Sequence, residues 1–366
     1  SPGLYMQQLL QRNRGLDRGY NMKAVFIEGH GGPEVLRYGQ RPEPAIADHE
    51  VKVRVRAVAL NRLDTYVRAG VRGQRKQFPP PLILGGDSAG EVVSVGDRVT
   101  TLQVGQRVVI NPRISCGTCS FCLSGDDDLC SSFRFLGSDA DGSYAEFVSV
   151  PAANAYPIAD QVSFQEAAAV PTVYLPIWNM LIRKAQLKPW ETVLVLSASA
   201  GVGTAAIQVA KNIIGARVIA TTSSQEKASR ALELGADHVI DYTSEDITAR
   251  VKELTEGQGV DAVVDHVGAQ FFEAAYNSLK RGGRYGVCGV TTGYQAQLQL
   301  GTLFTKQLRV FGVYMGSKED MRQIVEMLNQ GKIKPVIHQT FPLNQAAEAH
   351  RAMEGRSFFG KLVLTP

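Results

Sequence analysis

A chain of 366 residues, of which 44% are hydrophobic and 20% charged, is typical of a globular protein and is long enough for two domains. The formal net charge of +4 is small for this length, and the Lys and Arg residues are scattered, which argues against a nucleic-acid partner. No apolar run approaches the ~20 residues that span a bilayer. We therefore expect no membrane partner and a cytoplasmic protein.

The first 21 residues, "SPGLYMQQLLQRNRGLDRGYN", have neither the apolar core of a secretory signal nor the alternation of a strand. We interpret residues 1–21 as a tag or a disordered leader, and we expect the fold to begin near Met22.

From residue 22 to about 155 the apolar residues mostly recur at every second position. The clearest stretch is "EVKVRVRAV", in which Val51, Val53 and Val55 alternate with Lys52 and Arg54. This alternation predicts a half-buried antiparallel strand. Similar short runs separated by Gly, Pro and Asp turns predict a partly open, barrel-like β domain.

Four of the five cysteines lie close together with the spacing C-x2-C-x2-C-x7-C. This spacing lets four thiolates converge tetrahedrally on Zn²⁺ at about 2.3 Å. Local disulfides or a redox thiol cluster are the alternatives, and the odd cysteine count and large chain argue against disulfides. Four protein ligands leave no open coordination position, so we expect a structural zinc. The predicted ligands are Cys116, Cys119, Cys122 and Cys130.

After about residue 156, apolar strands alternate with amphipathic helices. The runs "ETVLVLSA", "VGTAAIQVAKNII", "ARVIATT" and "SQEKASRALELG" show the rhythm, which continues to about residue 309. Such alternation predicts a doubly wound parallel sheet covered by helices on both faces.

The turn after the first of these strands reads "SASAGVG", residues 197–203. Small residues at this point allow a tight turn and let backbone amides approach a pyrophosphate at the start of the following helix. An ordinary glycine turn is the alternative, but the placement between a buried strand and a helix favours a dinucleotide site. The predicted cofactor-binding residues of the turn are Ala198, Ala200, Gly201, Val202 and Gly203.

The end of the second strand indicates which dinucleotide binds. Thr222 stands where an NAD site would have a carboxylate for the ribose 2′-hydroxyl. Ser223 can hydrogen-bond a 2′-phosphate, Lys227 can neutralise it and Tyr242 can reach it. A solvated helix charge at Lys227 and a strand-end aromatic at Tyr242 are the alternatives. We predict NADPH as the cofactor.

The order of these parts resembles the medium-chain dehydrogenase/reductase superfamily: a β domain, a four-cysteine lobe, a nucleotide-binding half and a C-terminal return in "GKLVLTP". The resemblance implies an α/β fold. A GroES-like β-barrel catalytic domain would comprise residues 22–155 and 310–366, with the zinc lobe near 116–130. A Rossmann NADP-binding domain would comprise residues 156–309.

Alcohol-oxidising members of that superfamily hold a second, catalytic zinc on three motifs. The corresponding segments here are "NRLD", "GGD" and "AAAVPTVYLPIW", which place Asn61, Gly86 and Thr172 at the ligand positions. Asn and Thr are poor zinc ligands and Gly is none. We therefore expect no catalytic zinc.

The segment "NRLDTYVRAG" is similar to the "N-x-x-D-x-Y-x-R-x-G" of the quinone oxidoreductase branch, although most of that branch lacks the cysteine lobe. The branch implies NADPH-dependent reduction of quinones or α,β-unsaturated carbonyls, which needs no Lewis acid. One alternative is an enoyl-CoA reductase, with Arg72, Arg75 and Lys76 at a basic entrance, unless these three residues only form a solvated loop. The other is a non-catalytic nucleotide-binding protein, crystallin-like or RNA-associated.

Several residues are candidates for roles at such a site. Asn61 would hydrogen-bond the substrate carbonyl or the nicotinamide ribose, unless it only caps a turn. Tyr66 would donate a proton or line the pocket, unless it is a core aromatic. Asp64 fits a supporting carboxylate better than an acid. Gly289 opens a loop that resembles the family segment beside the nicotinamide, and we interpret Cys288 as buried packing.

The run "LRVFGVYM", residues 308–315, is apolar and follows the last expected strand of the parallel sheet. An exposed apolar edge strand needs a cover. We predict a homodimer or homotetramer in which two such edges pair. The alternative is that the helix expected in "KEDMRQIVEMLNQ" shields the strand.

Overall fold

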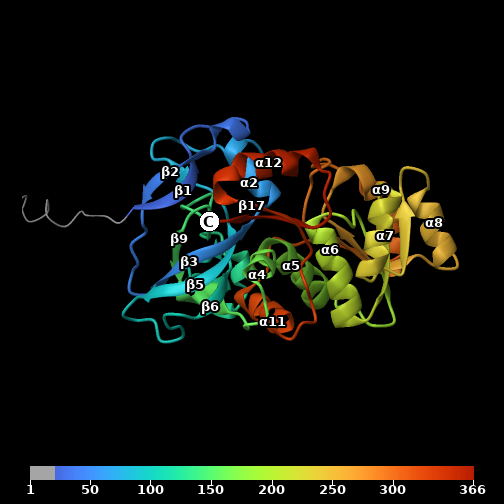
Figure 1. Ribbon diagram of the computed structural model, residues 1–366. Helices are drawn as coiled ribbons and strands as arrows, with labels where there is room; N and C mark the ends of the chain where they lie inside the picture. The colour runs from blue at the N-terminus through green and yellow to red at the C-terminus, as the bar shows by residue number, and fades with distance from the viewer. Residues whose placement is uncertain (1–20) are drawn as a thin grey trace, which may run out of the picture.

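The computed structural model describes residues 21–366. The predicted leader lies outside the described residues apart from Asn21, which begins the first strand. The chain forms a β-rich domain and a domain built on a parallel sheet (Figure 1). This confirms the predicted α/β architecture.

The β-rich domain is built on a seven-stranded sheet. Val51, Val53 and Val55 are buried, and Arg54 and Arg56 between them are exposed, as the alternation in the sequence predicts. The strands run in the order β10 (Ala155–Pro157), β6 (Arg107–Ile110), β5 (Asp87–Val95), β3 (Glu50–Ala59), β18 (Lys361–Thr365) and β17 (Ile337–Pro342), and β9 (Phe147–Pro151) also pairs with β3.

Two smaller sheets complete this domain. The first has the order β2 (Arg37–Pro42), β1 (Asn21–Ile27) and β4 (Leu82–Ile83), and the second pairs β7 (Arg113–Ile114) with β8 (Arg134–Phe135). β7 and β8 flank the cysteine segment, so the predicted zinc lobe projects from this two-stranded base.

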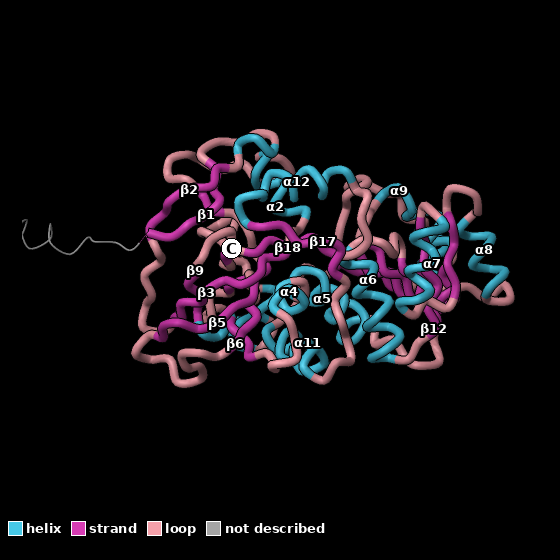
Figure 2. The backbone as a smooth tube through the Cα atoms, in the orientation of Figure 1, coloured by secondary structure: helices cyan, strands magenta, loops and turns pink. Residues whose placement is uncertain are grey.

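The C-terminal strand returns to the β-rich domain. Val363 and Leu364 of β18 pair antiparallel with Ala59 and Val58 of β3. In Figure 2, β17 and β18 lie between β3 and helix α6, which belongs to the second domain. Lys361, the first residue of β18, is therefore brought beside the end of β3.

The second domain contains a six-stranded sheet in which every neighbouring pair is parallel. The strand order is β13 (His238–Asp241), β12 (Arg217–Thr222), β11 (Thr192–Val195), β14 (Val260–Asp265), β15 (Leu279–Val287) and β16 (Arg309–Gly312). This is the order of doubly wound dinucleotide-binding sheets. The predicted domain boundary at 309/310 falls inside β16.

Helices cover the sheets and connect the domains. The α-helices are α2 (Arg62–Ala69), α3 (Ser120–Ser124), α4 (Phe164–Ala168), α5 (Pro171–Trp178), α6 (Gly201–Gln208), α7 (Gln225–Leu234), α8 (Ile247–Leu254), α9 (Ala269–Asn277), α10 (Leu300–Thr305), α11 (Lys318–Asn329) and α12 (Ala346–Gly355). Two π-helical segments, η4 (Asn179–Lys184) and η5 (Val209–Ile214), continue α5 and α6. The 3₁₀ turns are η1 (Pro33–Val35), η2 (Asp127–Leu129), η3 (Ala152–Asn154) and η6 (Leu343–Gln345).

Within residues 21–366, none of the helices combines the length and apolar character that crossing a membrane requires.

Candidate active site

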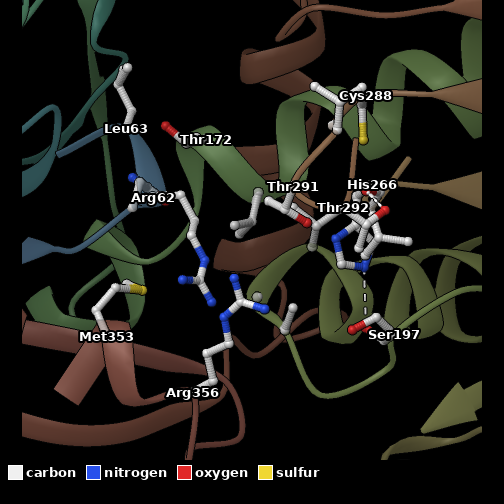
Figure 3. A pocket seen from close by; sticks show the side chains of 18 of the residues that line it. Arg62, Leu63, Thr172, Ser197, His266, Cys288, Thr291, Thr292, Met353 and Arg356 are labelled. Carbon is white, nitrogen blue, oxygen red and sulfur yellow. Dashed lines mark hydrogen bonds between the residues drawn. The ribbon is translucent and has the colours of Figure 1, made fainter. Parts of the chain in front are cut away.

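A cavity of about 570 Å³ lies between the two domains. Its walls come from the first turns of α2 and α5, the turn after β11, the loops after β14 and β15, the segment after β16 and the segment before β18 (Figure 3). The carboxyl ends of β11, β14 and β15 therefore face it, which is where doubly wound sheets bind their ligands.

The turn between β11 and α6 has the shape of a phosphate-binding turn. A Cβ on Gly203 would lie 2.1 Å from the carbonyl oxygen of Ser197, so only glycine fits where the helix crosses the strand end. Ala200 precedes α6 in an extended conformation without a side-chain cap, which leaves the first amides of the helix available to an anion. Ser199, Ala200, Gly201 and Val202 line the cavity, whereas Ala198 is fully buried behind the turn.

His266, at the end of β14, supports this turn. Its Nε2 lies 2.8 Å from the carbonyl oxygen of Leu196 and 3.2 Å from that of Ser197 (Figure 3). Ser197 has a φ of +54°, which is uncommon for a residue with a side chain. Burial lowers the pKa of His266, so a neutral imidazole donates to these carbonyls.

The end of the cavity beside β12 and β13 contains three of the residues predicted for a 2′-phosphate. Ser223, Lys227 and Tyr242 line the cavity, and the Tyr242 ring lies 4.7 Å from the ring of Phe271. Thr222 is turned away: it is 2% exposed, and its hydroxyl donates to the carbonyl oxygen of Ser224 at 3.2 Å. Thr222 ends β12, at the position where an NAD site would have a carboxylate.

The cavity is strongly basic. Among residues 21–366, no acidic side chain lines it, and five basic side chains do, namely Arg62, Arg72, Lys227, Arg356 and Lys361. Figure 3 shows the guanidinium groups of Arg62 and Arg356 facing each other. Burial and, next, the charge of Arg356 lower the pKa of Arg62. Two facing cations without a carboxylate between them favour a polyanionic ligand such as a diphosphate.

A buried polar network closes the inner end of the cavity. Asn61 Nδ2 donates to Asp87 Oδ2 at 3.0 Å, and Lys361 Nζ donates to Asn61 Oδ1 at 2.6 Å. The Thr172 hydroxyl donates to Asp87 Oδ1 at 2.6 Å, and the Thr172 amide donates to Asp87 Oδ2 at 3.0 Å. Lys361 Nζ also donates to the carbonyl oxygen of Leu60 at 2.5 Å. Every polar atom of the Asn61 side chain thus has a defined orientation.

The four clustered cysteines lie apart from this cavity, in the lobe between β7 and β8. Their sulfur atoms all lie within 4.8 Å of one another, and the Cys116 and Cys122 sulfurs are 3.9 Å apart. A tetrahedral zinc site has sulfur–sulfur distances of about 3.8 Å, from zinc–sulfur bonds of about 2.3 Å. Hydrogen bonds from the amides of Thr118 and Cys119 lower the pKa of the Cys116 thiol to about 6. The donor set therefore fits a structural zinc ion.

Comparisons with known proteins agree with this geometry. An alcohol dehydrogenase GroES-like domain model matches residues 47–160, and a zinc-binding dehydrogenase model matches residues 201–330. A crystal structure of an NAD-dependent alcohol dehydrogenase is 44% identical with a TM-score of 0.90, over 94% of this chain and 100% of that one. The chain belongs to the medium-chain dehydrogenase/reductase superfamily.

Curated relatives within this superfamily carry different activities. A quinone oxidoreductase of Salmonella typhimurium is 33% identical over 93% of this chain and 99% of its own length. An acryloyl-coenzyme A reductase of Metallosphaera sedula is 32% identical over 94% of this chain and 100% of its own length. The present chain is accordingly an oxidoreductase of the medium-chain superfamily, for which a nicotinamide cofactor is expected.

Of the three residues predicted for catalysis, Asn61 and Tyr66 line the cavity and Asp64 does not. Asn61 is the N-cap residue of α2 and lines the cavity, and its side chain is hydrogen-bonded to Asp87 and Lys361. Tyr66 also lines the cavity, and the Arg72 guanidinium lies 4.9 Å from its ring centre. Asp64 is 4% exposed and lies behind the cavity wall. Its Oδ2 accepts a hydrogen bond from the backbone amide of Asn61 at 2.8 Å. Its place is that of a supporting carboxylate.

Several residues of the candidate site were not predicted from the sequence. Asp87, Lys361, Arg62 and Arg356 were not predicted, because no periodicity or motif spacing links "GGD", "NRLD" and "GKLVLTP" across hundreds of residues. One signal was present in "GKLVLTP", because Lys361 is the first residue of a strand that is otherwise mostly apolar. Cys288 packs against the core, as expected, but it also lines the cavity next to Gly289. Burial and then the charge of Asp265 raise the pKa of the Cys288 thiol to about 12.

Proposed function

We propose that this oxidoreductase reduces quinones or α,β-unsaturated carbonyl compounds with NADPH and without a catalytic metal. The observation that carries the proposal is the hydrogen bond from Lys361 Nζ to Asn61 Oδ1 at the inner end of the cavity. It places a buried ammonium beside the first of the three positions at which zinc-dependent members hold their catalytic metal.

The other two positions support the same conclusion. A Cβ on Gly86 would lie 2.9 Å from Cε1 of Phe135 and 3.1 Å from Cβ of Pro112, so a ligating side chain has no room there. The Thr172 hydroxyl is already bonded to Asp87. Neither Asn nor Thr is a good zinc ligand, and a lysine ammonium repels a dication.

Asn61 is suited to stabilise the charge that forms when a conjugated C=C bond is reduced. The negative charge collects on the substrate's carbonyl oxygen, where a fixed hydrogen-bond donor lowers the barrier. Of the two Nδ2 protons of Asn61, one goes to Asp87, and the other has no acceptor among the described residues. Lys361 holds Oδ1, so the amide cannot flip and present its oxygen instead.

The remaining groups complete the reaction. A nicotinamide bound at the carboxyl ends of the parallel strands would supply the hydride. The Tyr66 hydroxyl, on the cavity wall, is the group that we assign as proton donor to the substrate carbon. The wall around it contains Leu63, Phe135 and Tyr314, an apolar and aromatic surface that suits a flat quinone or enone.

The basic lining supports NADPH over NADH. NADPH carries one more phosphate, and Ser223 and Lys227 line the cavity where they can bind it. Arg62 and Arg356, which also line the cavity, are suited to the pyrophosphate. A solved structure that is 44% identical to this chain is called NAD-dependent, so the assay compares NADPH with NADH.

A second candidate activity is reduction of an enoyl-CoA thioester, which the similarity to an acryloyl-coenzyme A reductase favours. Of the basic residues predicted at an entrance, Arg72 lies at the cavity and Arg75 is exposed. Lys76 is engaged with the Ser138 hydroxyl at 3.0 Å. The cavity volume of about 570 Å³ beside the nucleotide turn argues against a purely structural, non-catalytic role.

We further propose that two chains pair through β16, as a homodimer or within a homotetramer. β16 is the outermost strand of the sheet as described for residues 21–366. Helix α11, which was the alternative cover, packs against α5 and β10 instead. Large apolar side chains remain exposed along this edge, namely Leu300, Phe304, Val310 and Tyr314. A twofold pairing of β16 would cover both copies.

The test is a panel of quinones, enones and enoyl-CoA esters assayed for consumption of NADPH and NADH. Quinones and enones consumed with NADPH at the highest kcat/KM support the proposal. A preference for enoyl-CoA esters would select the second candidate, and NAD⁺-dependent oxidation of simple alcohols with no enone reduction would contradict both.

A further inference from the structure

The crossover between β16 and α11, residues 313–317, forms one wall of the cavity. Tyr314 and Met315 line the cavity from this segment. Met315 has a φ of +55°, a conformation uncommon for a residue with a side chain, which persists only where the surroundings hold it. Contacts from elsewhere in the molecule must therefore hold the crossover in place.

One contact runs from the cysteine lobe through a fully buried asparagine. Asn179, on the π-helical continuation of α5, donates through Nδ2 to the carbonyl oxygen of Met315 at 3.2 Å and to Asp128 Oδ2 at 3.3 Å. Asp128 is 7% exposed, and Arg183 Nη2 lies 3.1 Å from the same carboxylate oxygen. Asp128, two residues before the last cysteine of the lobe, therefore fixes the amide that holds Met315.

A second contact reaches the other end of the crossover. The Asp127 carboxylate accepts from the backbone amide of Lys318, the first residue of α11, at 3.1 Å and 3.3 Å. A carboxylate at a helix N-terminus is favoured by the unpaired amides and the helix dipole. Lys318 Nζ in turn donates to the Ser115 hydroxyl at 2.8 Å, on the residue before Cys116.

A third contact reaches the aromatic ring of the wall. The Arg113 guanidinium donates to the carbonyl oxygens of Asp127 at 2.7 Å and Cys130 at 3.1 Å. Its Cζ lies 4.2 Å from the ring centre of Phe133 and 5.6 Å from that of Tyr314. Arg113 is 4% exposed and Tyr314 is 54% exposed, so the stack is shielded from water on the side of the guanidinium and open on the side of Tyr314.

We propose that the cysteine lobe positions this wall of the active site, with Arg113, Asp127 and Asp128 as the positioning residues. Asp127 and Asp128 lie within the segment that four metal-bound thiolates would close, so a zinc-closed lobe fixes the crossover through Met315 and through Lys318, which follows it. The lobe thereby has a role in the shape of the cavity as well as in local stability. Only the assignment of the cavity as the active site rests on the proposed function.

Hydrogen–deuterium exchange on the full zinc-loaded chain tests this. Asp127→Ala removes the carboxylate from the Lys318 amide, and Asp126→Ala is the matched control, since Asp126 contacts Ser124 and Arg183 but not the crossover. We expect exchange in the peptide covering 312–320 to rise about tenfold or more in Asp127→Ala, with unchanged zinc content, and to stay at the wild-type rate in Asp126→Ala. Exchange at 197–204 should be unaffected in both.

Zinc removal under reducing conditions provides the second arm. The same 312–320 peptide should lose protection in the metal-free wild type before the strands of the parallel sheet do. Unchanged protection of this peptide in Asp127→Ala would overturn the proposal, whatever the metal-free protein shows. The exchange readout needs no substrate, so it is independent of whether quinone or enone reduction is confirmed.

Discussion

The ammonium of Lys361 donates to the side-chain oxygen of Asn61 across 2.6 Å, although 300 positions separate the two residues in the chain. The bond joins the first residue of the last strand to the residue that precedes α2. Burial lowers the pKa of Lys361, and the charges of Asp87 and Asp64 oppose that shift. The same bond orients the Asn61 amide toward both Asp87 and the cavity.

Asn61→Leu should lower kcat/KM for an enone by about 10²- to 10³-fold, because removal of one fixed donor to a developing oxyanion has that typical cost. The dissociation constant of NADPH should change little. Asn277→Leu, at an exposed helix position, is the control. Steady-state kinetics with fluorescence titration of NADPH measure both quantities, and a rate within about threefold of wild type would exclude Asn61 as the donor.

Lys227→Ala should raise KM for NADPH about tenfold or more, the size of a lost charge-assisted contact, and leave the NADH reaction nearly unchanged. The reason is that only NADPH carries the 2′-phosphate. Lys252→Ala, in α8 and outside the cavity lining, is the control. If the wild-type protein binds NADH as tightly as NADPH, the cofactor assignment is wrong.

The cysteine lobe should hold about one zinc per chain. Cys122→Ser should lower the melting temperature by several degrees, because the metal links folding to ligand binding, and any loss of turnover should accompany that fall. Elemental analysis of the reduced protein measures the zinc content, and calorimetry measures the melting temperature. Lost turnover with unchanged melting would mean that the lobe takes part in the chemistry.

Asp64→Asn should change how stability depends on pH. Burial, with Asp87 adding to it, raises the pKa of Asp64 from 3.8 to about 7. Because the folded pKa lies above the unfolded one, this group's stabilising contribution is complete below pH 3.8 and is lost as pH rises through 7. The wild type should therefore lose about 1.4 kcal/mol relative to the variant between pH 6 and 8. Urea unfolding at both pH values measures the difference, and parallel curves would show that Asp64 stays ionised.

Val310→Lys should disrupt the pairing of chains that we propose at β16. Val310 lies in the edge strand and is 37% exposed, and a lysine there would place like charges against each other in a twofold interface. Light scattering at micromolar concentration should give a dimer or tetramer for the wild type and a monomer for the variant. A wild-type mass near the 39.7 kDa of one chain that persists as concentration rises would contradict the pairing.

The sequence was sufficient for features that depend on local patterns. Alternation over β3, the cysteine spacing of the lobe and the strand–turn–helix at 197–203 each predicted a structure that forms there. Contacts between distant segments were not predictable, because nothing near Asn61 indicates that Lys361 will pair with it. The arginine pair of Arg62 and Arg356 was missed for the same reason. Cys288 shows a further limit, since an apolar neighbourhood does not distinguish the core from the wall of a cavity.

The most direct test of metal-independent reduction is to measure zinc content and turnover on the same preparation. With about one zinc per chain, we expect NADPH-dependent reduction of a quinone or enone and no NADP⁺- or NAD⁺-dependent oxidation of simple alcohols. Adding zinc should not create alcohol oxidation, because Asn61, Gly86 and Thr172 provide no site for it. Alcohol oxidation that rises in proportion to a second zinc per chain would contradict the proposal.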